Sequence, residues 1–196
     1  MEPFRTIRSI ATPLDKINVD TDQIVPKQFL KLIQKTGFGK HLFFDWRFEK
    51  DGKPRRDFVL NDPKYRNSRI LLTGDNFGCG SSREHAVWAL QDYGFGVIIS
   101  TSFADIFYSN CLKNGVLPIK VRQQTLQKLF ETKSEIEVNL ENQLIKLAGI
   151  KIPFEIESHW KKILLQGLDD IAITLKHEDK ISKYEGSQAN TKFQVS

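Results

Sequence analysis

The pattern of apolar residues in the middle of the chain predicts buried strands joined by helices. Residues 69–73 and 97–100 are short, continuous apolar runs, typical of strands covered on both faces. The segment between them carries apolar residues at helical spacing: Ala86, Val87, Ala89, Leu90 and Tyr93. A second predicted helix, over residues 103–112, leads to a third strand over residues 116–121. Because strand–helix–strand units connect neighbouring parallel strands, this order predicts a parallel βαβ core.

Segments on either side of this core predict antiparallel additions. Residues 135–140 and 143–147 alternate apolar and polar positions as in a β-hairpin, and residues 150–156 alternate as well. The other predicted elements are strands over residues 4–11, 58–60 and 171–175 and helices over residues 27–35 and 159–165. The fold class is therefore mixed α/β. The 196 residues fit one domain over 1–185 and a polar, flexible tail over 186–196.

Composition and charge restrict the class of protein. With 40% hydrophobic and 27% charged residues, the chain has the composition of a soluble globular protein. It shows no apolar stretch suited to a signal peptide or a membrane helix, and its two cysteines favour a reducing compartment, so we expect a cytoplasmic protein. The net charge of +5 is spread along the chain apart from a cluster at Lys53, Arg55 and Arg56. Solvated faces, or an anionic substrate or partner, explain this charge without nucleic acid.

The strongest candidate site is the segment of residues 78–85 (GCGSSREH), between a predicted strand and a predicted helix. Ser81 and Glu84 have the spacing of a capping box, which is a structural role. The two glycines let the backbone approach a ligand, and the free N–H groups of a helix N-terminus favour an anion. The planar guanidinium of Arg83 suits a carboxylate. The loop therefore has the features of an anion site as well as those of a helix cap.

Other kinds of chemistry at this loop are excluded or stay open. A phosphate-binding loop is excluded because serine, not lysine, follows Gly80, and the dinucleotide fingerprint fails because Arg83 replaces its third glycine. A cysteine hydrolase or amidase stays open, since a helix N-terminus would lower the pKa of Cys79. Such an enzyme would act alone and be sensitive to thiol alkylation. A non-catalytic domain that binds a small dicarboxylate is a third hypothesis.

Residues 78–86 (GCGSSREHA), which follow a buried strand and a Gly-Asp-Asn-Phe turn, resemble the signature of the swivelling domain of aconitase-type hydro-lyases. Within that group the match is closest to the small subunits of bacterial 3-isopropylmalate dehydratases. The resemblance extends to residues 19–30 (VDTDQIVPKQFL), and shorter matches lie at residues 36–48, 92–95, 102–107 and 167–169. It covers roughly residues 5–185 and implies a β/β/α swivelling-domain architecture for the mixed α/β fold.

For function, the resemblance implies a hydro-lyase that interconverts 2-isopropylmalate and 3-isopropylmalate in leucine biosynthesis by removing water and adding it back. In that family a [4Fe–4S] cluster binds the hydroxyl that leaves. Such a cluster needs at least three thiolates, whereas this chain has only Cys79 and Cys111. We therefore expect no metal or cofactor on this chain, a cluster in a separate large subunit, and activity only in the complex of the two.

The resemblance also assigns roles to individual residues. Ser81 corresponds to the catalytic base of the family, and Ser82 and Arg83 would bind a carboxylate of the substrate. Thr21 and Asp22 would lie at the mouth of the active site. The segment that meets the variable substituent of the substrate corresponds to Phe29, Leu30, Lys31 and Leu32. Apolar residues there suit an isopropyl group, but Lys31 leaves related malates and citraconate open.

Three stretches carry competing interpretations. Asp20 and Asp22 have a D-x-D spacing that can hold Mg²⁺, yet a turn closed by an aspartate side chain explains them too, and the resemblance assigns no metal there. An ordinary structural helix is an alternative for residues 29–32. The aromatic-rich residues 38–48 lack a period, so we interpret them as a loop that orders against the large subunit or closes over substrate.

Overall fold

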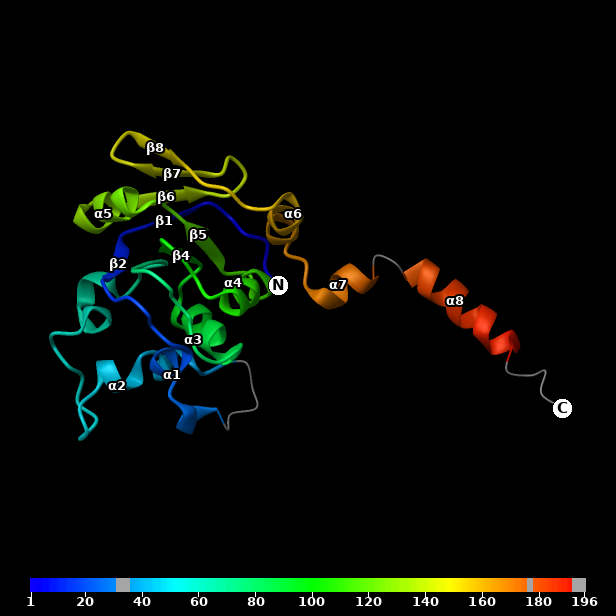
Figure 1. Ribbon diagram of the computed structural model, residues 1–196, viewed down its shortest axis with the longest axis horizontal. Helices are drawn as coiled ribbons and strands as arrows, with labels where there is room; N and C mark the ends of the chain where they lie inside the picture. The colour runs from blue at the N-terminus through cyan, green and yellow to red at the C-terminus, as the bar shows by residue number, and fades with distance from the viewer. Residues whose placement is uncertain (31–35, 176–177, 192–196) are drawn as a thin grey trace.

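The computed structural model describes residues 1–30, 36–175 and 178–191, which form two four-stranded sheets flanked by helices (Figure 1). The parallel sheet has the order β2-β3-β4-β5, with strands β2 (Ala11–Leu14), β3 (Ile70–Thr73), β4 (Val97–Ser100) and β5 (Leu117–Lys120). Every neighbouring pair in this sheet is parallel, with Ile70 of β3 opposite both Ala11 and Val97. The predicted parallel βαβ core is confirmed.

The second sheet is antiparallel and has the order β1-β6-β7-β8. Its strands are β1 (Ile7–Ser9), β6 (Ile136–Asn139), β7 (Leu144–Leu147) and β8 (Ile150–Pro153). The predicted hairpin is confirmed as β6 and β7, in which buried residues alternate with partly buried ones. The single strand predicted over residues 4–11 is wrong, because the chain leaves β1 at Ile10 and enters β2 in the other sheet.

The helices connect and cover these sheets (Figure 1). They are α1 (Thr21–Ile24), α2 (Phe44–Arg47), α3 (His85–Tyr93), α4 (Asp105–Asn114), α5 (Gln123–Glu131), α6 (Ser158–Gln166), α7 (Asp170–Leu175) and α8 (Glu178–Thr191). Short 3₁₀ turns lie at Lys27–Phe29, Gly39–His41, Val59–Asn61 and Pro63–Tyr65. In Figure 1, α7 and α8 lead away from the two sheets toward the C-terminus. Across the described residues, none of the helices has the length and apolar character needed to cross a membrane.

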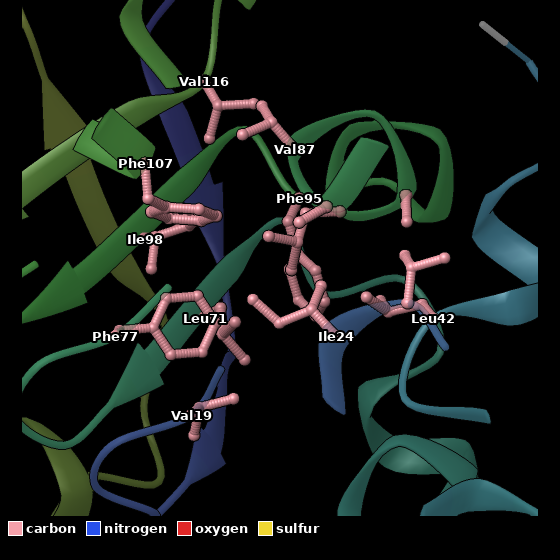
Figure 2. Packing of buried hydrophobic residues seen from close by; sticks show 14 of the residues in the cluster. Val19, Ile24, Leu42, Leu71, Phe77, Val87, Phe95, Ile98, Phe107 and Val116 are labelled. Atoms are coloured by element: carbon pink, nitrogen blue, oxygen red, sulfur yellow. The ribbon is translucent and has the colours of Figure 1, made fainter. Parts of the chain in front are cut away.

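The two faces of the parallel sheet bury different side chains, because consecutive residues of a strand point to opposite faces. Leu71 and Ile98 pack into one cluster with residues of α3 and α4, and Figure 2 shows them beside Phe77 and Phe107. Their strand neighbours belong to a second cluster, with the antiparallel sheet, α5 and α6: Ile70, Leu72, Val97 and Ile99. Since both faces are covered, the ends of the parallel strands are where a ligand site is expected in such a sheet.

Several predicted elements differ from the structure. The strand predicted over residues 171–175 is helix α7, since a lone strand without a neighbour would leave its backbone groups unpaired. Residues 58–60 enter a 3₁₀ turn instead of forming a strand. Helix α5 was not predicted. The helix predicted over residues 27–35 is a 3₁₀ turn in its first three residues, and residues 31–35 lie outside the described part. The domain boundary at residue 185 stays a prediction.

The aromatic-rich residues 38–48 contribute several side chains to the core, which their lack of a period did not predict, whereas their contact with the large subunit or with substrate stays a prediction. Phe38, Leu42 and Phe43 are fully buried. The Phe43 ring stacks on Trp46 at a centroid separation of 5.5 Å, and Phe43 itself has a positive φ of 49°. Short 3₁₀ and α-helical turns carry these side chains inward at irregular intervals. The segment therefore packs densely without a helical or a strand period.

Candidate active site at the ends of the parallel strands

The candidate site begins with a loop that leaves the carboxyl end of β3 and reaches α3. Gly78 has a φ of +77°, and a Cβ added there would lie 2.5 Å from both Cδ atoms of Phe107 and closer still to its Cγ. Phe107 is buried on α4, where its ring packs edge-on against Phe77 at 5.3 Å. Only glycine therefore lets this loop pass directly over the core. The close neighbour of Gly78 is thus a phenyl ring of the protein itself, and the predicted approach of this backbone to a ligand stays a prediction.

A second loop, which precedes α1, lies against the first. Asp20 and Cys79 form an isolated parallel bridge. The Thr21 N–H donates to the Cys79 carbonyl at 2.9 Å, and the Gly78 N–H donates to the Val19 carbonyl at 2.8 Å. Residues that are about 60 positions apart in the sequence are thus fixed side by side, and this brings together the residues predicted from the two motifs.

Thr21 and Ser81 are joined directly. The Ser81 N–H donates to Thr21 Oγ1 at 3.2 Å, and Thr21 Oγ1 donates to the Ser81 carbonyl at 3.2 Å. Thr21 is buried, whereas Ser81 and Ser82 are exposed. Within the described residues the hydroxyls of Ser81 and Ser82 have no hydrogen-bond partner. The backbone of the loop is therefore held from below while its two hydroxyl groups remain available to a ligand.

Charged side chains complete the site. Arg83 Nη1 forms an ion pair with Asp22 Oδ1, and Asp22 Oδ2 lies 3.5 Å from Lys27 Nζ. The side chain of Arg83 is 20% exposed and that of Asp22 is 40% exposed, so the pair lies at the surface beside the two serines. Two cations share one carboxylate here. The excess of positive charge favours a further anion next to Arg83.

The predicted capping box does not form. Helix α3 begins at His85, and Glu84, which precedes it, makes no side-chain cap. Glu84 Oε1 instead accepts a hydrogen bond from Asn114 Nδ2 of α4 at 2.6 Å. The prediction that Ser81 begins the helix is therefore wrong by several residues. The Ser81 hydroxyl therefore does not cap helix α3.

The paired aspartates have separate roles, and neither points to a metal. The Asp20 carboxylate accepts from the Gln23 N–H at 2.7 Å and Gln23 Oε1 accepts from the Asp20 N–H at 2.9 Å, a reciprocal cap of α1. Asp22 binds Arg83 instead. In the part of the chain that the structure describes, no three His, Cys, Asp or Glu residues are grouped so as to hold a metal ion.

Neither cysteine has the environment of a nucleophile or of a cluster ligand. Burial, followed by the nearby Asp20 carboxylate, raises the pKa of the Cys79 thiol. This contradicts the lowered pKa that the cysteine-hydrolase hypothesis requires. Cys111 is fully buried on α4, and desolvation raises the pKa of its thiol well above the usual value. Two such thiols do not fit the thiolate set of an iron–sulfur cluster.

His85 packs against two aromatic side chains, Phe38 and Trp88, at ring separations of 5.3 and 4.6 Å.

The segment predicted to recognise the substrate is described only in its first half. Phe29 and Leu30 are partly buried against the first core cluster. The Phe29 ring stacks on His41 with a centroid separation of 3.9 Å and an interplanar angle of 15°. Lys31 and Leu32 lie outside the described residues.

Sequence reasoning missed two residues that support this site. Asn114 binds the Glu84 carboxylate, and His41 stacks on Phe29. Asn114 stands in an Asn-Gly pair that marks the end of a helix, and this local role concealed its long-range contact. His41 lies in the aromatic segment without a period, where no pattern indicates its partner.

Comparison with known proteins identifies the family. The family model of the aconitase C-terminal domain matches residues 1–124, and the model of the C-terminal domain of the 3-isopropylmalate dehydratase small subunit matches residues 170–192. A 3-isopropylmalate dehydratase small subunit from Shouchella clausii is 52% identical over 193 residues, covering 96% of this chain and 98% of the relative. The Bacillus subtilis small subunit is 51% identical over 195 residues, covering 97% and 98%. The chain belongs to the 3-isopropylmalate dehydratase small-subunit family.

A solved structure extends the family relationship to the fold. The 3-isopropylmalate dehydratase LeuD from Methanocaldococcus jannaschii aligns with a TM-score of 0.69 and 26% identity, over 92% of this chain and 99% of that one. The predicted aconitase-like mixed α/β architecture is confirmed. The relatives are named as small subunits of an enzyme, so membership of this family implies a larger partner chain.

Proposed function

We propose that this chain is the small subunit of a cytoplasmic 3-isopropylmalate dehydratase, which converts 2-isopropylmalate to 3-isopropylmalate in leucine biosynthesis. The names of its relatives support the enzyme class. The observation that carries the proposal is the joining of the Thr21 loop to the Ser81 loop. This junction leaves the exposed hydroxyls of Ser81 and Ser82, which have no hydrogen-bond partner among the described residues, next in the chain to Arg83 and its ion pair with Asp22. These groups suit a dicarboxylate substrate.

Ser81 is proposed as the base that removes a proton from the carbon next to a substrate carboxylate. A serine hydroxyl is a weak base, so its alkoxide needs stabilisation by nearby N–H groups and positive charge. Thr21 fixes the backbone of Ser81 through two hydrogen bonds, and Arg83 supplies positive charge two residues away. A base placed in this way contributes about 10²–10⁴-fold to the rate.

Ser82 and Arg83 are proposed to bind a carboxylate of the substrate. In the structure Asp22 already neutralises Arg83, and Lys27 lies on the other oxygen of Asp22. An arriving carboxylate would share Arg83 with Asp22, while Lys27 keeps Asp22 partly compensated. Thr21 and Asp22 thus lie at the mouth of the site as supports. The planar guanidinium suits this use because it can bind two oxygens at once.

The isopropyl group of the substrate is proposed to meet Phe29, Leu30, Lys31 and Leu32. Phe29 and Leu30 supply the apolar contact that a branched alkyl group needs. Lys31 of the same segment keeps related malates and citraconate open as alternative substrates.

The other half of the reaction is proposed to belong to the large subunit. Its [4Fe–4S] cluster would supply the site that binds the hydroxyl leaving the substrate. The cysteines of this chain do not suit such a cluster. The proposed roles of this chain are therefore to remove the substrate proton and to bind a substrate carboxylate. We propose no nucleic-acid partner and no membrane attachment.

The test is hydration of 2-isopropylmaleate, followed by its ultraviolet absorbance, with each chain alone and with both together. The large subunit is loaded with its cluster under anaerobic conditions, and complex formation is checked by size-exclusion chromatography. Turnover that requires both chains supports the proposal. An intact complex that binds dicarboxylates but leaves 2-isopropylmaleate unchanged would exclude this substrate, and turnover by this chain alone would exclude the division of labour.

A further inference from the structure

The Glu84 carboxylate does not make the capping box that its spacing from Ser81 suggests, because helix α3 begins at His85. In a capping box the carboxylate would fold back to the Ser81 N–H. In the structure it turns the other way and accepts from Asn114 Nδ2 at 2.6 Å. The Ser81 N–H donates to Thr21 Oγ1 instead. The position of one negative charge therefore depends on a contact with α4.

Asn114 is itself fixed by a set of hydrogen bonds. Its Oδ1 accepts from Trp88 Nε1 at 3.1 Å, and its Nδ2 also donates to the Asn110 carbonyl at 2.9 Å. Its own carbonyl accepts from Gln91 Nε2 at 2.7 Å. The amide is thus oriented with its N–H group toward Glu84, and the orientation does not depend on Glu84 alone.

We infer that Asn114 is a positioning residue that holds the Glu84 carboxylate against α4 and thereby keeps negative charge out of the anion site at Ser81, Ser82 and Arg83. Without this contact the Glu84 carboxylate would be free to turn toward residues 81–83 and to add negative charge beside the proposed carboxylate-binding residues, while the Ser81 N–H stays bonded to Thr21 Oγ1. It would then repel the substrate. The inference rests on the proposed function for its effect on substrate, but the position of the charge can be measured independently of turnover.

The variant that tests this is Asn114→Asp. The new side chain keeps the size of asparagine and an acceptor for Trp88, but it presents a carboxylate oxygen to Glu84 and drives Glu84 away. In the reconstituted complex, KM for the dicarboxylate should rise about tenfold, equivalent to about 1.4 kcal/mol, with a smaller change in kcat. The rise should shrink at high salt because the repulsion is screened. Asn114→Ser, which removes the amide without adding charge, should act in the same direction.

The swap Glu84→Gln with Asn114→Asp is the matched control. It restores the hydrogen bond with donor and acceptor exchanged, and it keeps the total charge of the wild-type chain. KM should return to within about twofold of the wild-type value. Gln91→Ala, which removes a different bond between α3 and Asn114, should leave KM unchanged.

A second readout uses Cys79 in the isolated chain. Cys79 is partly exposed, whereas Cys111 is fully buried, so thiol reagents report on Cys79. The ratio of its rates with an anionic disulfide (5,5′-dithiobis-2-nitrobenzoate) and a neutral one (4,4′-dithiodipyridine) measures the local potential. In Asn114→Asp this ratio should fall about threefold at low salt, and the swap should restore it.

An unchanged ratio in Asn114→Asp and Asn114→Ser, or a ratio that falls equally in the swap, would overturn the inference. If the wild-type complex proves inactive on 2-isopropylmaleate, the proposed function fails, but the reagent ratio still decides whether Asn114 controls the charge at this loop.

Discussion

The passage of the site loop over Phe107 makes a quantitative prediction for Gly78→Ala. An added Cβ would lie 2.5 Å from two ring carbons of Phe107 and closer to a third. The ring is buried and packed on Phe77, and Phe103 lies parallel to it at 6.4 Å, so it has no free space to enter. Overpacking of this kind costs about 1–3 kcal/mol. The positive φ of Gly78 adds about 1–2 kcal/mol for any residue with a Cβ.

We therefore expect Gly78→Ala to lower the free energy of unfolding by about 2–5 kcal/mol. Gly52→Ala is a matched control, because Gly52 has a φ of +82° and no atom within 4 Å of the added Cβ. Its cost should be about 1–2 kcal/mol, from the backbone alone. Urea unfolding of the isolated chain, followed by circular dichroism, measures both values. Equal losses for the two variants would refute the argument that the loop is held against Phe107.

Three further predictions follow from the structure. Phe43→Ala should cost about 3–5 kcal/mol in urea unfolding, because Phe43 is fully buried, and a loss below about 1 kcal/mol would show that the segment is not core. Burial and the neighbouring Lys40 lower the pKa of His41 below 6.5, so the unfolded chain binds a proton more readily than the folded chain. The wild-type melting temperature should therefore fall more than that of His41→Phe as the pH drops below about 6.5, and parallel pH curves would contradict this. Arg83→Lys should raise KM for the dicarboxylate at least tenfold although it keeps the charge, since lysine cannot bind two oxygens in one plane; an unchanged KM would remove Arg83 from the site.

The elements with a clear period were predictable, and those that depend on distant partners were not. β3, β4 and α3 have continuous or helical apolar patterns, and the structure places them within a few residues of their predicted bounds. Residues 171–175 are apolar enough for a strand, but they pair with neither sheet and form α7. A local pattern indicates a conformation only when the rest of the chain supplies the matching surface.

In the candidate site, too, the features set by local sequence were predictable and those that depend on distant residues were not. The glycines and the Ser-Ser-Arg run marked the loop, but the capping-box spacing of Ser81 and Glu84 predicted a helix start that the structure lacks. Asn114 of α4 takes Glu84 instead, over a separation of 30 residues. No local rule tells whether the Glu84 carboxylate accepts from a distant donor such as Asn114 Nδ2 or from a donor nearby in the sequence. The junction between Thr21 and Ser81 was likewise expected only through resemblance to a family, because 60 residues separate the two positions.

The central claim is that Ser81 of this chain removes the substrate proton, and exchange with solvent tests it most directly. The complex with the cluster-loaded large subunit is incubated with 2-isopropylmalate in deuterium oxide, and proton NMR follows loss of the methylene signal. We expect wild-type exchange to fall about 10²–10⁴-fold in Ser81→Ala while the complex still co-elutes on size exclusion. Ser82→Ala should instead raise KM more than it lowers kcat. Exchange at the wild-type rate in an intact Ser81→Ala complex would contradict the account.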